Sequence, residues 1–453
     1  DVKFKYKEFN FDKTIVKNET SGSVTYSVKN IKALKKEEMA PSLRKIVPYV
    51  MFGLNKFEIE GVVGYADNWE VFGKWVHDKL LSDTEEIEEE TIVYLTKLIG
   101  GETSNLKKAK IIYEYVQNKT RYVSIQLGIG GWKPMLAKDV DRLGYGDCKA
   151  LTNYTRSLLK AFKVPSYYVI VYGDDEKRDL QEEFVSMQGN HVILGIPDSD
   201  NIVWLECTSQ VQPFGFQGDF TDDRKVLIIG ENNSKITKTK AYINEQNYQK
   251  TDSKVILNDD NSVKCTVIIN SKGIIYDNKS PLKNANDDEV KKYYNDYFNI
   301  INNKKISKTE IVEDKKSLEL NENIEFEAND FMKPNQGKII VPLNCINQFS
   351  FVPKKYKDRK IPFEIDRGFC YEDESIISIQ SNFKVEALQS EQNLKNEFGS
   401  YEYKIELKNN ELVYKRKFLI KKGYYTPDQY EAYRKFREQV ARSENSKVLL
   451  ISK

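Results

Sequence analysis

The sequence predicts a multidomain α+β protein in which a core with helices, residues 67–244, lies between two β-rich regions, residues 1–66 and 245–453. The chain has 453 residues, and at roughly 100–200 residues per domain this length indicates about two to four domains. Apolar residues follow the helical period in the middle of the chain and alternate with polar ones before and after it. Turn-forming pairs such as Asn409-Asn410 divide the last region into short strands.

The composition limits the possible partners. The chain carries 70 basic and 68 acidic residues, for a formal net charge of +2. This balance argues against nucleic acid as the main partner, because phosphate binding needs a surplus of basic residues on one face. No apolar run reaches the ~18 residues of a membrane span, and no signal peptide is seen, so we expect no transmembrane segment. The composition favours no particular oligomeric state.

Histidine and cysteine are too few for a metal centre. The two histidines, His77 and His191, argue against a multi-histidine site. Five cysteines cannot all pair within one chain, and no CxxC motif occurs, so neither a disulfide framework nor a zinc ribbon is expected. The acidic residues between 219 and 223 lack the spacing of a calcium-binding EF-hand loop. We therefore expect no metal and no cofactor.

The first region, residues 1–66, is predicted to be β-rich. Val24, Tyr26 and Val28 alternate with other residues at the period of a half-buried strand, and residues 57–60 show a similar pattern. A region with so few strands has little core of its own. We therefore expect it to be part of a larger β-sandwich or to dock against another part of the chain.

Three helices are predicted to open the core. Apolar residues recur at helical spacing between 69 and 80, after Asp67, which can cap the helix. A second helix follows the acidic run 85–90, where negative charge suits the helix dipole, and ends at Gly100. The third covers roughly residues 105–118, with small and β-branched apolar residues on one face.

A glycine-rich loop, residues 128–134, is predicted to lead to a fourth helix that begins near Cys148. Three strands are then predicted, the last two joined by turn residues. The strands cover residues 167–172, 191–196 and 202–207. The apolar face of the fourth helix is expected in the core and consists of Leu151, Tyr154, Leu158 and Phe162.

The last region, residues 245–453, is predicted to consist mostly of strands. Two pairs of apolar runs flank clusters of turn residues and predict hairpins. The paired runs are 255–257 with 265–269, and 403–407 with 412–418. One helix is predicted to interrupt the strands over roughly 287–302, and another to close the chain over roughly 428–443.

The segment Gly144-Tyr145-Gly146-Asp147-Cys148-Lys149 is the sharpest chemical signal in the sequence. Two glycines allow a tight approach, and a cysteine then opens an amphipathic helix. Unpaired N–H groups and the positive end of the helix dipole favour a thiolate there, the nucleophilic form of cysteine. The same N–H groups can hold an oxyanion. The alternative is a buried structural cysteine, because free cysteine is among the most buried residue types.

His191 is the candidate base. It follows Gly189-Asn190 and begins an apolar strand, where an imidazole is placed to take the thiol proton and later return it. The alternative is an exposed histidine at a strand end.

Glu206 is the candidate for the third role, because it lies in an otherwise apolar run and burying a carboxylate alone is costly. A hairpin turn with an even number of residues pairs Pro197 with Ile202 and places Glu206 on the same face as His191. A turn with an odd number places the two side chains on opposite faces. The neighbouring Cys207 then points into a core.

The order of these residues resembles the transglutaminase-like (papain-like) superfamily. The resemblance covers residues 105–230 and is carried by Gly146-Asp147-Cys148-Lys149, Asn190-His191-Val192 and Trp204-Leu205-Glu206-Cys207-Thr208. It implies a transglutaminase-like cysteine-protease core between sandwich-like regions. Those regions resemble domains of unknown function in proteins of Bacteroidetes-type bacteria.

The resemblance implies a role for each site residue. Cys148 is the nucleophile and His191 the base, and Glu206 stands where the family usually has Asp. The family often has an upstream Trp or Gln that helps to bind the oxyanion, which makes Gln126 and Trp132 candidates. Trp132 follows two glycines and is equally a packing residue, the interpretation that we favour.

The expected reaction is acyl transfer at an amide bond of a protein or peptide substrate. We expect hydrolysis by a peptidase or amidase, because the sequence shows no feature that would exclude water from the acyl-enzyme. The alternative outcome is transamidation by a transglutaminase-like acyltransferase, in which an amine takes the acyl group. The alternative hypothesis is a catalytically inactive scaffold that serves as an extracytoplasmic binding module, and the Glu in place of Asp favours it. The resemblance alone implies an extracytoplasmic location, periplasmic or at the cell surface.

Overall fold

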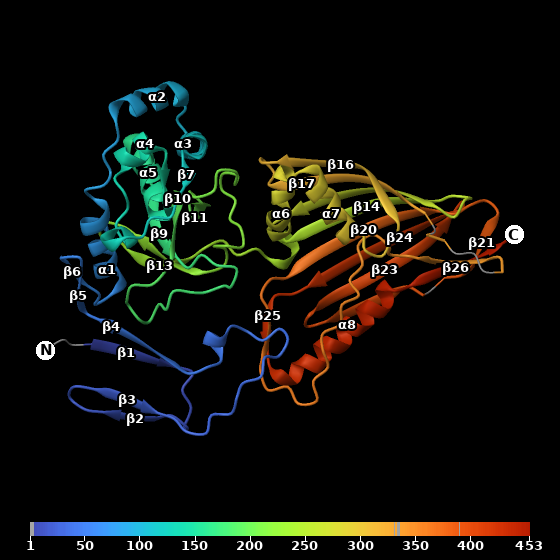
Figure 1. The fold of residues 1–453 in the computed structure, drawn as a ribbon, viewed down its shortest axis with the longest axis horizontal. Coiled ribbons are helices and arrows are strands. Elements are labelled where there is room, and N and C mark those ends of the chain that lie inside the picture. Colours follow the sequence, from blue (N-terminus) through green and yellow to red (C-terminus); the bar gives the residue numbers. More distant parts are fainter. Residues whose placement is uncertain (1–3, 330, 333–335, 389) are drawn as a thin grey trace. The chain divides into compact units, whose positions relative to one another are not determined.

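The computed structural model describes residues 4–329, 331–332, 336–388 and 390–453. Its chain divides into two compact units (Figure 1). The first unit comprises the chain up to residue 31 together with 43–241, and the second comprises 32–42 and 242–453. The three-part division at residues 66 and 244 stays a prediction. Within the described ranges, no helix is long and apolar enough to cross a membrane.

The strands of the first region pair two by two, all antiparallel. The pairs are β1 (Phe4–Phe9) with β4 (Tyr49–Leu54), β2 (Val16–Glu19) with β3 (Val24–Ser27), and β5 (Lys56–Ile59) with β6 (Val62–Tyr65). In β3 the exposure alternates, with Val24 and Tyr26 half-buried, as the period of the sequence predicts. Val28 follows the end of the strand and is exposed, so the predicted period is wrong at that residue. The region is β-rich, and its membership of a larger sandwich stays a prediction.

A five-stranded antiparallel sheet lies at the centre of the first unit (Figure 1). Its strands, in spatial order, are β11 (Asn201–Leu205), β10 (His191–Asp198), β9 (Tyr167–Val171), β12 (Lys225–Ile229) and β13 (Lys235–Lys238). Successive residues of β10 enter different apolar clusters: Val192 and Leu194 on one face, and Ile193 on the other. Burial on both faces explains why this strand reads as a continuous apolar run.

The described residues of the first unit form five α-helices. They are α1 (Trp69–Trp75), α2 (Glu89–Ile99), α3 (Asn105–Lys119), α4 (Ala137–Leu143) and α5 (Cys148–Ala161). A π-helical segment, Val76–Leu81, continues α1. Asn68, and not Asp67, caps α1 by accepting a hydrogen bond from Val71 N at 2.8 Å. The sequence did not predict α4, which has only two turns between Pro134 and Gly144.

Short elements complete this part of the chain. They are β7 (Arg121–Tyr122), β8 (Tyr145–Gly146) and the 3₁₀ turns Leu43–Lys45 and Gly128–Gly131. β7 and β8 pair in parallel, which brings the segment before Cys148 against the end of α3.

Three of the four apolar residues predicted for the α5 face lie in the core. Leu151, Tyr154 and Leu158 are fully buried among side chains of α3, α4 and the sheet. Phe162 is only half-buried, so its predicted place in the core is wrong. The helix ends at Ala161, and Phe162 has left helical geometry, with φ −95° and ψ 15°. Its ring therefore packs at the margin of the cluster.

An eight-stranded sheet dominates the second unit (Figure 1). Its strands, in spatial order, are β16 (Lys304–Asp314), β17 (Glu319–Ala328), β15 (Val263–Lys272), β14 (Tyr248–Leu257), β20 (Phe369–Ser378), β24 (Glu411–Ile420), β23 (Gly399–Lys408) and β22 (Gln392–Asn396). β14 and β20 are parallel, and the other neighbours are antiparallel. Both predicted hairpins are confirmed, as β14–β15 and β23–β24.

Smaller sheets and three helices complete the part of the second unit that the structure describes. The further strands are β18 (Lys338–Pro342), β26 (Lys447–Ser452) and β21 (Phe383–Ala387) in one sheet, and β19 (Phe363–Ile365) with β25 (Gly423–Tyr425) in another. The helices are α6 (Ile274–Lys279), α7 (Asp287–Tyr297) and α8 (Tyr430–Glu444), with 3₁₀ turns at Asn244–Gln246, Ser280–Asn284 and Pro427–Gln429. α7 ends five residues before the predicted 302, and α6 was not predicted.

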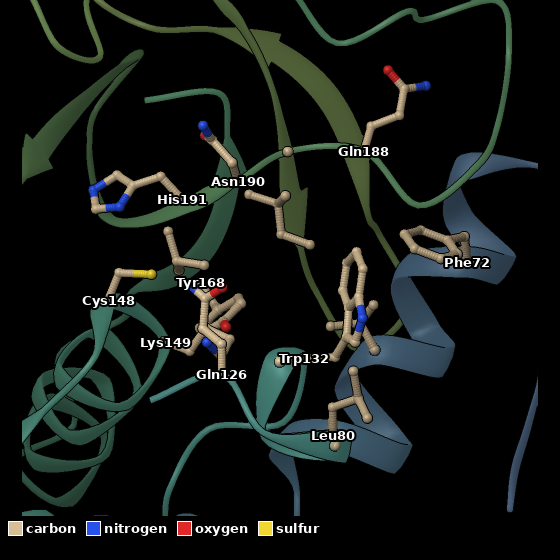
Figure 2. A pocket seen from close by; sticks show the side chains of 16 residues that line it. Phe72, Leu80, Gln126, Trp132, Cys148, Lys149, Tyr168, Gln188, Asn190 and His191 are labelled. Atoms are coloured by element: carbon tan, nitrogen blue, oxygen red, sulfur yellow. The ribbon is translucent and has the colours of Figure 1, made fainter. Parts of the chain in front are cut away.

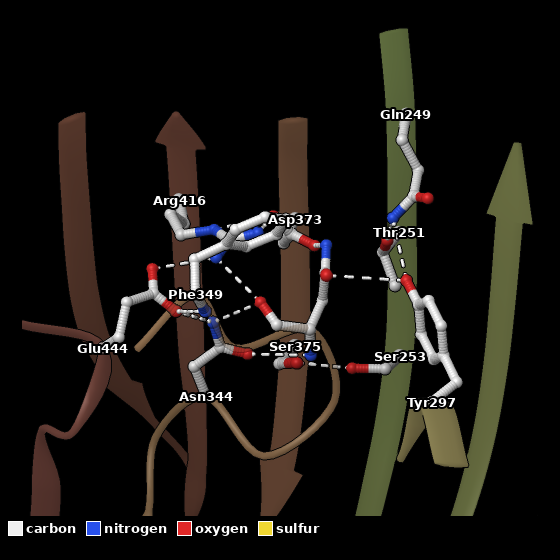
Figure 3. A network of polar contacts seen from close by, with 11 residues as sticks. Gln249, Thr251, Ser253, Tyr297, Asn344, Phe349, Asp373, Ser375, Arg416 and Glu444 are labelled. Atoms are coloured by element: carbon white, nitrogen blue, oxygen red, sulfur yellow. Dashed lines mark hydrogen bonds and ion pairs between the residues drawn. The ribbon is translucent and has the colours of Figure 1, made fainter. Parts of the chain in front are cut away.

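A buried polar network crosses the core of the second unit (Figure 3). The guanidinium of Arg416 donates to Asp373 at 2.8 Å, to Glu444 at 2.8 Å and to the backbone oxygen of Asn347 at 2.8 Å. Asn344 also donates to Glu444, at 2.7 Å. Charged side chains that are buried away from water need hydrogen-bonding partners of opposite charge. Through these contacts the network joins the C-terminal end of α8 to strands β20 and β24.

We predict that Leu158→Ala costs about 2–5 kcal/mol of stability, the range for a fully buried leucine, and that Phe162→Ala costs clearly less. Urea unfolding of both variants, followed by tryptophan fluorescence, measures the difference. The four tryptophans, at positions 69, 75, 132 and 204, all lie in the first unit, so their emission follows that unit alone. Equal costs for the two variants would contradict the packing described above.

Candidate active site

The backbone before Cys148 explains how its sulfur is placed. α4 ends at Gly144 in the left-handed region, with φ 69°, and a Cβ at Gly146 would lie 2.8 Å from the Cβ of Ala150. Glycine is therefore needed at both positions. Cys148 is the first residue of α5, as predicted, and Asp147 caps this helix by accepting from Ala150 N at 3.0 Å.

His191 is the first residue of β10 and is buried. Asn190 before it accepts from Gly173 N at 2.7 Å and donates to Gly173 O at 3.1 Å. The ring of Phe220 packs edge-on against the imidazole, with the ring centroids 5.2 Å apart. These contacts fix the ring, so His191 is not the exposed strand-end residue of the alternative interpretation.

The β10–β11 hairpin brings Glu206 to His191. Its turn has two residues, Ser199 and Asp200, and Pro197 pairs with Ile202. The even register is thus confirmed, and the Oε2 atom of Glu206 lies 2.8 Å from Nε2 of His191. Glu206 itself lies just beyond the last residue of β11 and not within a strand as predicted, because the chain turns there.

Thr208 holds the second oxygen of the Glu206 carboxylate. Oε1 accepts from Thr208 N at 3.1 Å and from its hydroxyl at 2.6 Å. The backbone oxygen of Glu206 accepts from the hydroxyl of Tyr113 at 2.9 Å. The longer side chain of glutamate therefore reaches the imidazole from a turn that is fixed at both ends. Sequence reasoning missed Thr208 and Tyr113, and the position of Thr208 two residues after the carboxylate was the available signal.

The charged forms of His191 and Glu206 stabilise each other. Burial lowers the pKa of His191, but the Glu206 carboxylate and the hydrogen bond with Cys148 outweigh it and raise the pKa to about 10. Burial likewise raises the pKa of Glu206, yet His191 and Thr208 hold it below its ordinary value. Because Nε2 of the ring faces Glu206, the other nitrogen is left for Cys148.

The other four cysteines are removed from solvent. They are Cys207, Cys265, Cys345 and Cys370, all buried. Burial raises the pKa of each thiol, to about 12 for Cys207 and about 11 for Cys370. Cys207 packs in the cluster beneath α5, as predicted. These thiols are therefore poor nucleophiles near neutral pH.

The acidic segment 219–223 surrounds a buried arginine. Arg224 is fully buried and donates to the backbone oxygens of Tyr172 at 2.6 Å and Asp219 at 2.7 Å. These hydrogen bonds hold the loop in place, a structural role for Arg224 that the sequence did not predict. Over the described part of the chain, no group of three or more His, Cys, Asp or Glu side chains is arranged to hold a metal ion.

A pocket of about 460 Å³ opens beside Cys148 and His191 (Figure 2). Both oxyanion candidates line it: Gln126 is exposed, and Trp132 is half-buried and packs against the neighbouring apolar cluster. Packing is thus established for Trp132, whereas oxyanion binding by either residue stays a prediction. His77 is not among the lining residues, and its Nδ1 atom lies 2.8 Å from Asp78.

We predict that Glu206→Gln lowers the pH at which His191 loses its proton. The carboxylate is the main influence that raises the pKa of His191. The neutral amide of glutamine can still orient the ring, but it no longer stabilises the imidazolium. Burial then dominates, and it favours the uncharged form of His191. Imidazole NMR signals followed between pH 5 and pH 11 measure the midpoint, and the signal of His77, the other histidine, is the internal reference. An unchanged His191 midpoint would contradict the assigned pairing.

Thr208→Val should slow alkylation of Cys148 by iodoacetamide about 2- to 10-fold, which corresponds to the loss of one hydrogen bond to the carboxylate. Thr208→Ser keeps the hydroxyl and should alkylate at nearly the wild-type rate. Mass spectrometry of the labelled peptide gives the rates. If both variants behave alike, the Thr208 hydroxyl does not position Glu206.

Two family models match this chain. Residues 93–215 match the transglutaminase-like superfamily, close to the range 105–230 that carried the resemblance. Residues 337–450 match a domain of unknown function with a solved structure, DUF3858. A comparison with curated proteins gives no match.

One solved structure shares the fold of the whole chain. It is the crystal structure of a candidate protease from Parabacteroides distasonis, with a TM-score of 0.58 and 13% sequence identity. The likeness covers 99% of this chain and 70% of the other. At this identity it concerns the fold alone. The chain thus contains a core of the transglutaminase-like superfamily, which holds Cys148, His191 and Glu206, and a DUF3858 domain follows it.

Proposed function

We propose that the protein is a thiol-dependent acyl-transfer enzyme that hydrolyses amide bonds in a protein or peptide substrate. The observation that carries this proposal is the chain of contacts from Glu206 through His191 to Cys148, at the edge of an open pocket. A nucleophile, a base and a group that orients the base are the three parts that such a reaction needs. The match of residues 93–215 to the transglutaminase-like superfamily supports the same reaction class.

In the first step, the Cys148 sulfur attacks the carbonyl carbon of the substrate while His191 holds the thiol proton. Glu206 stabilises the imidazolium that forms. The carbonyl oxygen becomes an oxyanion, for which N–H groups of the first turn of α5 and the side chain of Gln126 are candidate donors. Ala150 N is already bound to Asp147 and is not counted among them.

In the second step, His191 gives its proton to the departing amine as the C–N bond breaks, and a thioester remains on Cys148. The neutral imidazole then takes a proton from water, whose oxygen attacks the thioester carbonyl. The C–S bond breaks, the carboxylic acid leaves, and the Cys148–His191 pair is restored. Water is the proposed acceptor because the pocket beside Cys148 is open.

The inactive binding module is the weaker hypothesis. That hypothesis was favoured by the glutamate at position 206, where the family usually has aspartate. However, the Glu206 carboxylate lies 2.8 Å from the imidazole of His191. The extra methylene therefore does not separate the two groups. The extracytoplasmic location is independent of this choice and stays a prediction.

We expect the wild-type protein to cleave peptide bonds in a mixed peptide library, and Cys148→Ala to lower the rate by about 10³-fold or more. Mass spectrometry identifies the products. A fluorescent primary amine offered in parallel with a glutamine-rich protein measures transamidation. Amine incorporation that needs Cys148, without cleavage products, would overturn hydrolysis in favour of cross-linking.

The two histidines provide the matched control. His191→Gln should lose activity to a similar extent as Cys148→Ala, whereas His77→Gln should keep it, because His77 contacts Asp78 and lies outside the site. Retention of cleavage by His191→Gln would show that His191 is not the base. Absence of both cleavage and transamidation in the wild type, with Cys148 inert to iodoacetamide, would favour the binding module.

A further inference from the structure

The pocket beside Cys148 has an apolar far end (Figure 2). Phe72 of α1, Leu80 of the following π-helical segment and Trp132 of the loop before α4 lie at that end. Val76, Tyr168 and Ile170 add further apolar lining, and Tyr168 lies close to Cys148. Burial raises the pKa of Tyr168 well above its ordinary value, so its side chain is an uncharged part of the lining. The pocket volume of about 460 Å³ is ample for one large side chain.

Gln188, Asn190 and Lys149 line the pocket and are already engaged by the protein, whereas the exposed Gln126 is uncharged. Gln188 donates to Phe184 O at 2.7 Å and accepts from Gln181 N at 2.7 Å. Asn190 is held on both atoms of its amide by Gly173. The ammonium of Lys149 is paired with the buried carboxylate of Asp147. A charged substrate side chain would therefore enter without a free partner of opposite charge, which is costly.

The position of the apolar end relative to His191 and Cys148 indicates which part of the substrate binds there. In Figure 2 the imidazole of His191 lies at one end, and Trp132, Phe72 and Leu80 lie at the other, with Cys148 near the imidazole. The departing amine must lie against His191, because this residue protonates it. The acyl part of the substrate, bonded to the attacked carbonyl, therefore extends away from the imidazole towards the apolar end.

We propose that the pocket binds one large, uncharged apolar side chain on the acyl side of the attacked amide. This inference rests on the proposed function and adds the substrate class to it: peptides with Phe, Tyr, Leu or Met at the carbonyl residue or the residue before it. Binding of such a side chain removes apolar surface from water, which favours these peptides over their Asp and Lys counterparts.

Peptidyl fluoromethyl ketones test this without turnover. In the reaction the Cys148 thiolate displaces fluoride from the methylene carbon, so that a C–S bond forms as the C–F bond breaks. Matched probes carry Phe, Leu, Ala, Asp or Lys at each of the two acyl positions in turn. We expect the Phe and Leu probes to label Cys148 at least about tenfold faster than the Asp and Lys probes at one position.

Two adjacent glycines give a matched pair of variants. A Cβ at Gly131 or Gly130 meets no atom within 4 Å, and neither residue has a positive φ. Gly131 lines the pocket and Gly130 does not. Gly131→Leu should narrow the pocket and lower the Phe-to-Ala ratio of labelling rates several-fold, whereas Gly130→Leu should leave that ratio at its wild-type value.

The outcomes separate this inference from the function on which it rests. Equal labelling of Cys148 by all probes, or a preference for Asp or Lys, overturns the apolar assignment and leaves the thiol site in place. An equal change of the ratio in both glycine variants also overturns it. Failure of every probe and of iodoacetamide to label Cys148 overturns the thiol chemistry and this inference together.

Discussion

The contact between the Glu206 carboxylate and Nε2 of His191 is the interaction on which the geometry of the site depends. It exists because the β10–β11 turn has two residues, which pairs Leu194 with Leu205 and carries Glu206 to the face of the imidazole. A slip of one residue would turn every side chain of β11 to the opposite face. With one ring nitrogen bound to the carboxylate, the other is available to Cys148, so the register of a hairpin determines the arrangement of the nucleophile and its base.

Burial strengthens this contact, but it also requires that every polar atom of the pair has a hydrogen-bonding partner. Charges removed from water are costly unless hydrogen bonds satisfy them. Here Thr208 holds the second carboxylate oxygen and Tyr113 holds the backbone of the same residue. The same principle recurs in the second unit, where Arg416 joins Asp373 and Glu444 without access to solvent. In both units a polar cluster with many partners fixes the relative positions of elements that are far apart in the sequence.

Sequence patterns within a short segment predicted the features that depend on that segment alone. Glycine spacing and helical periodicity placed Cys148 at the start of α5, and turn residues identified the hairpins β14–β15 and β23–β24. The errors lie at the ends of elements and in short elements. Phe162 keeps the helical spacing but follows the last residue of the helix, and the two turns of α4 are too short for a periodic signal. The extent of a helix depends on capping and packing as well as on periodicity.

The sequence by itself determined the chemical types and their order: a cysteine at a helix N-terminus, a histidine at the start of a strand and a carboxylate in the next apolar run. Only the tertiary structure decided between the even and odd hairpin, brought Thr208 and Tyr113 to Glu206, and assembled the apolar pocket. The pocket walls come from α1, the loop before α4 and β9, which share no period along the chain. Periodicity records which face of an element is buried, whereas a cavity depends on how several elements pack together, and no single segment encodes that.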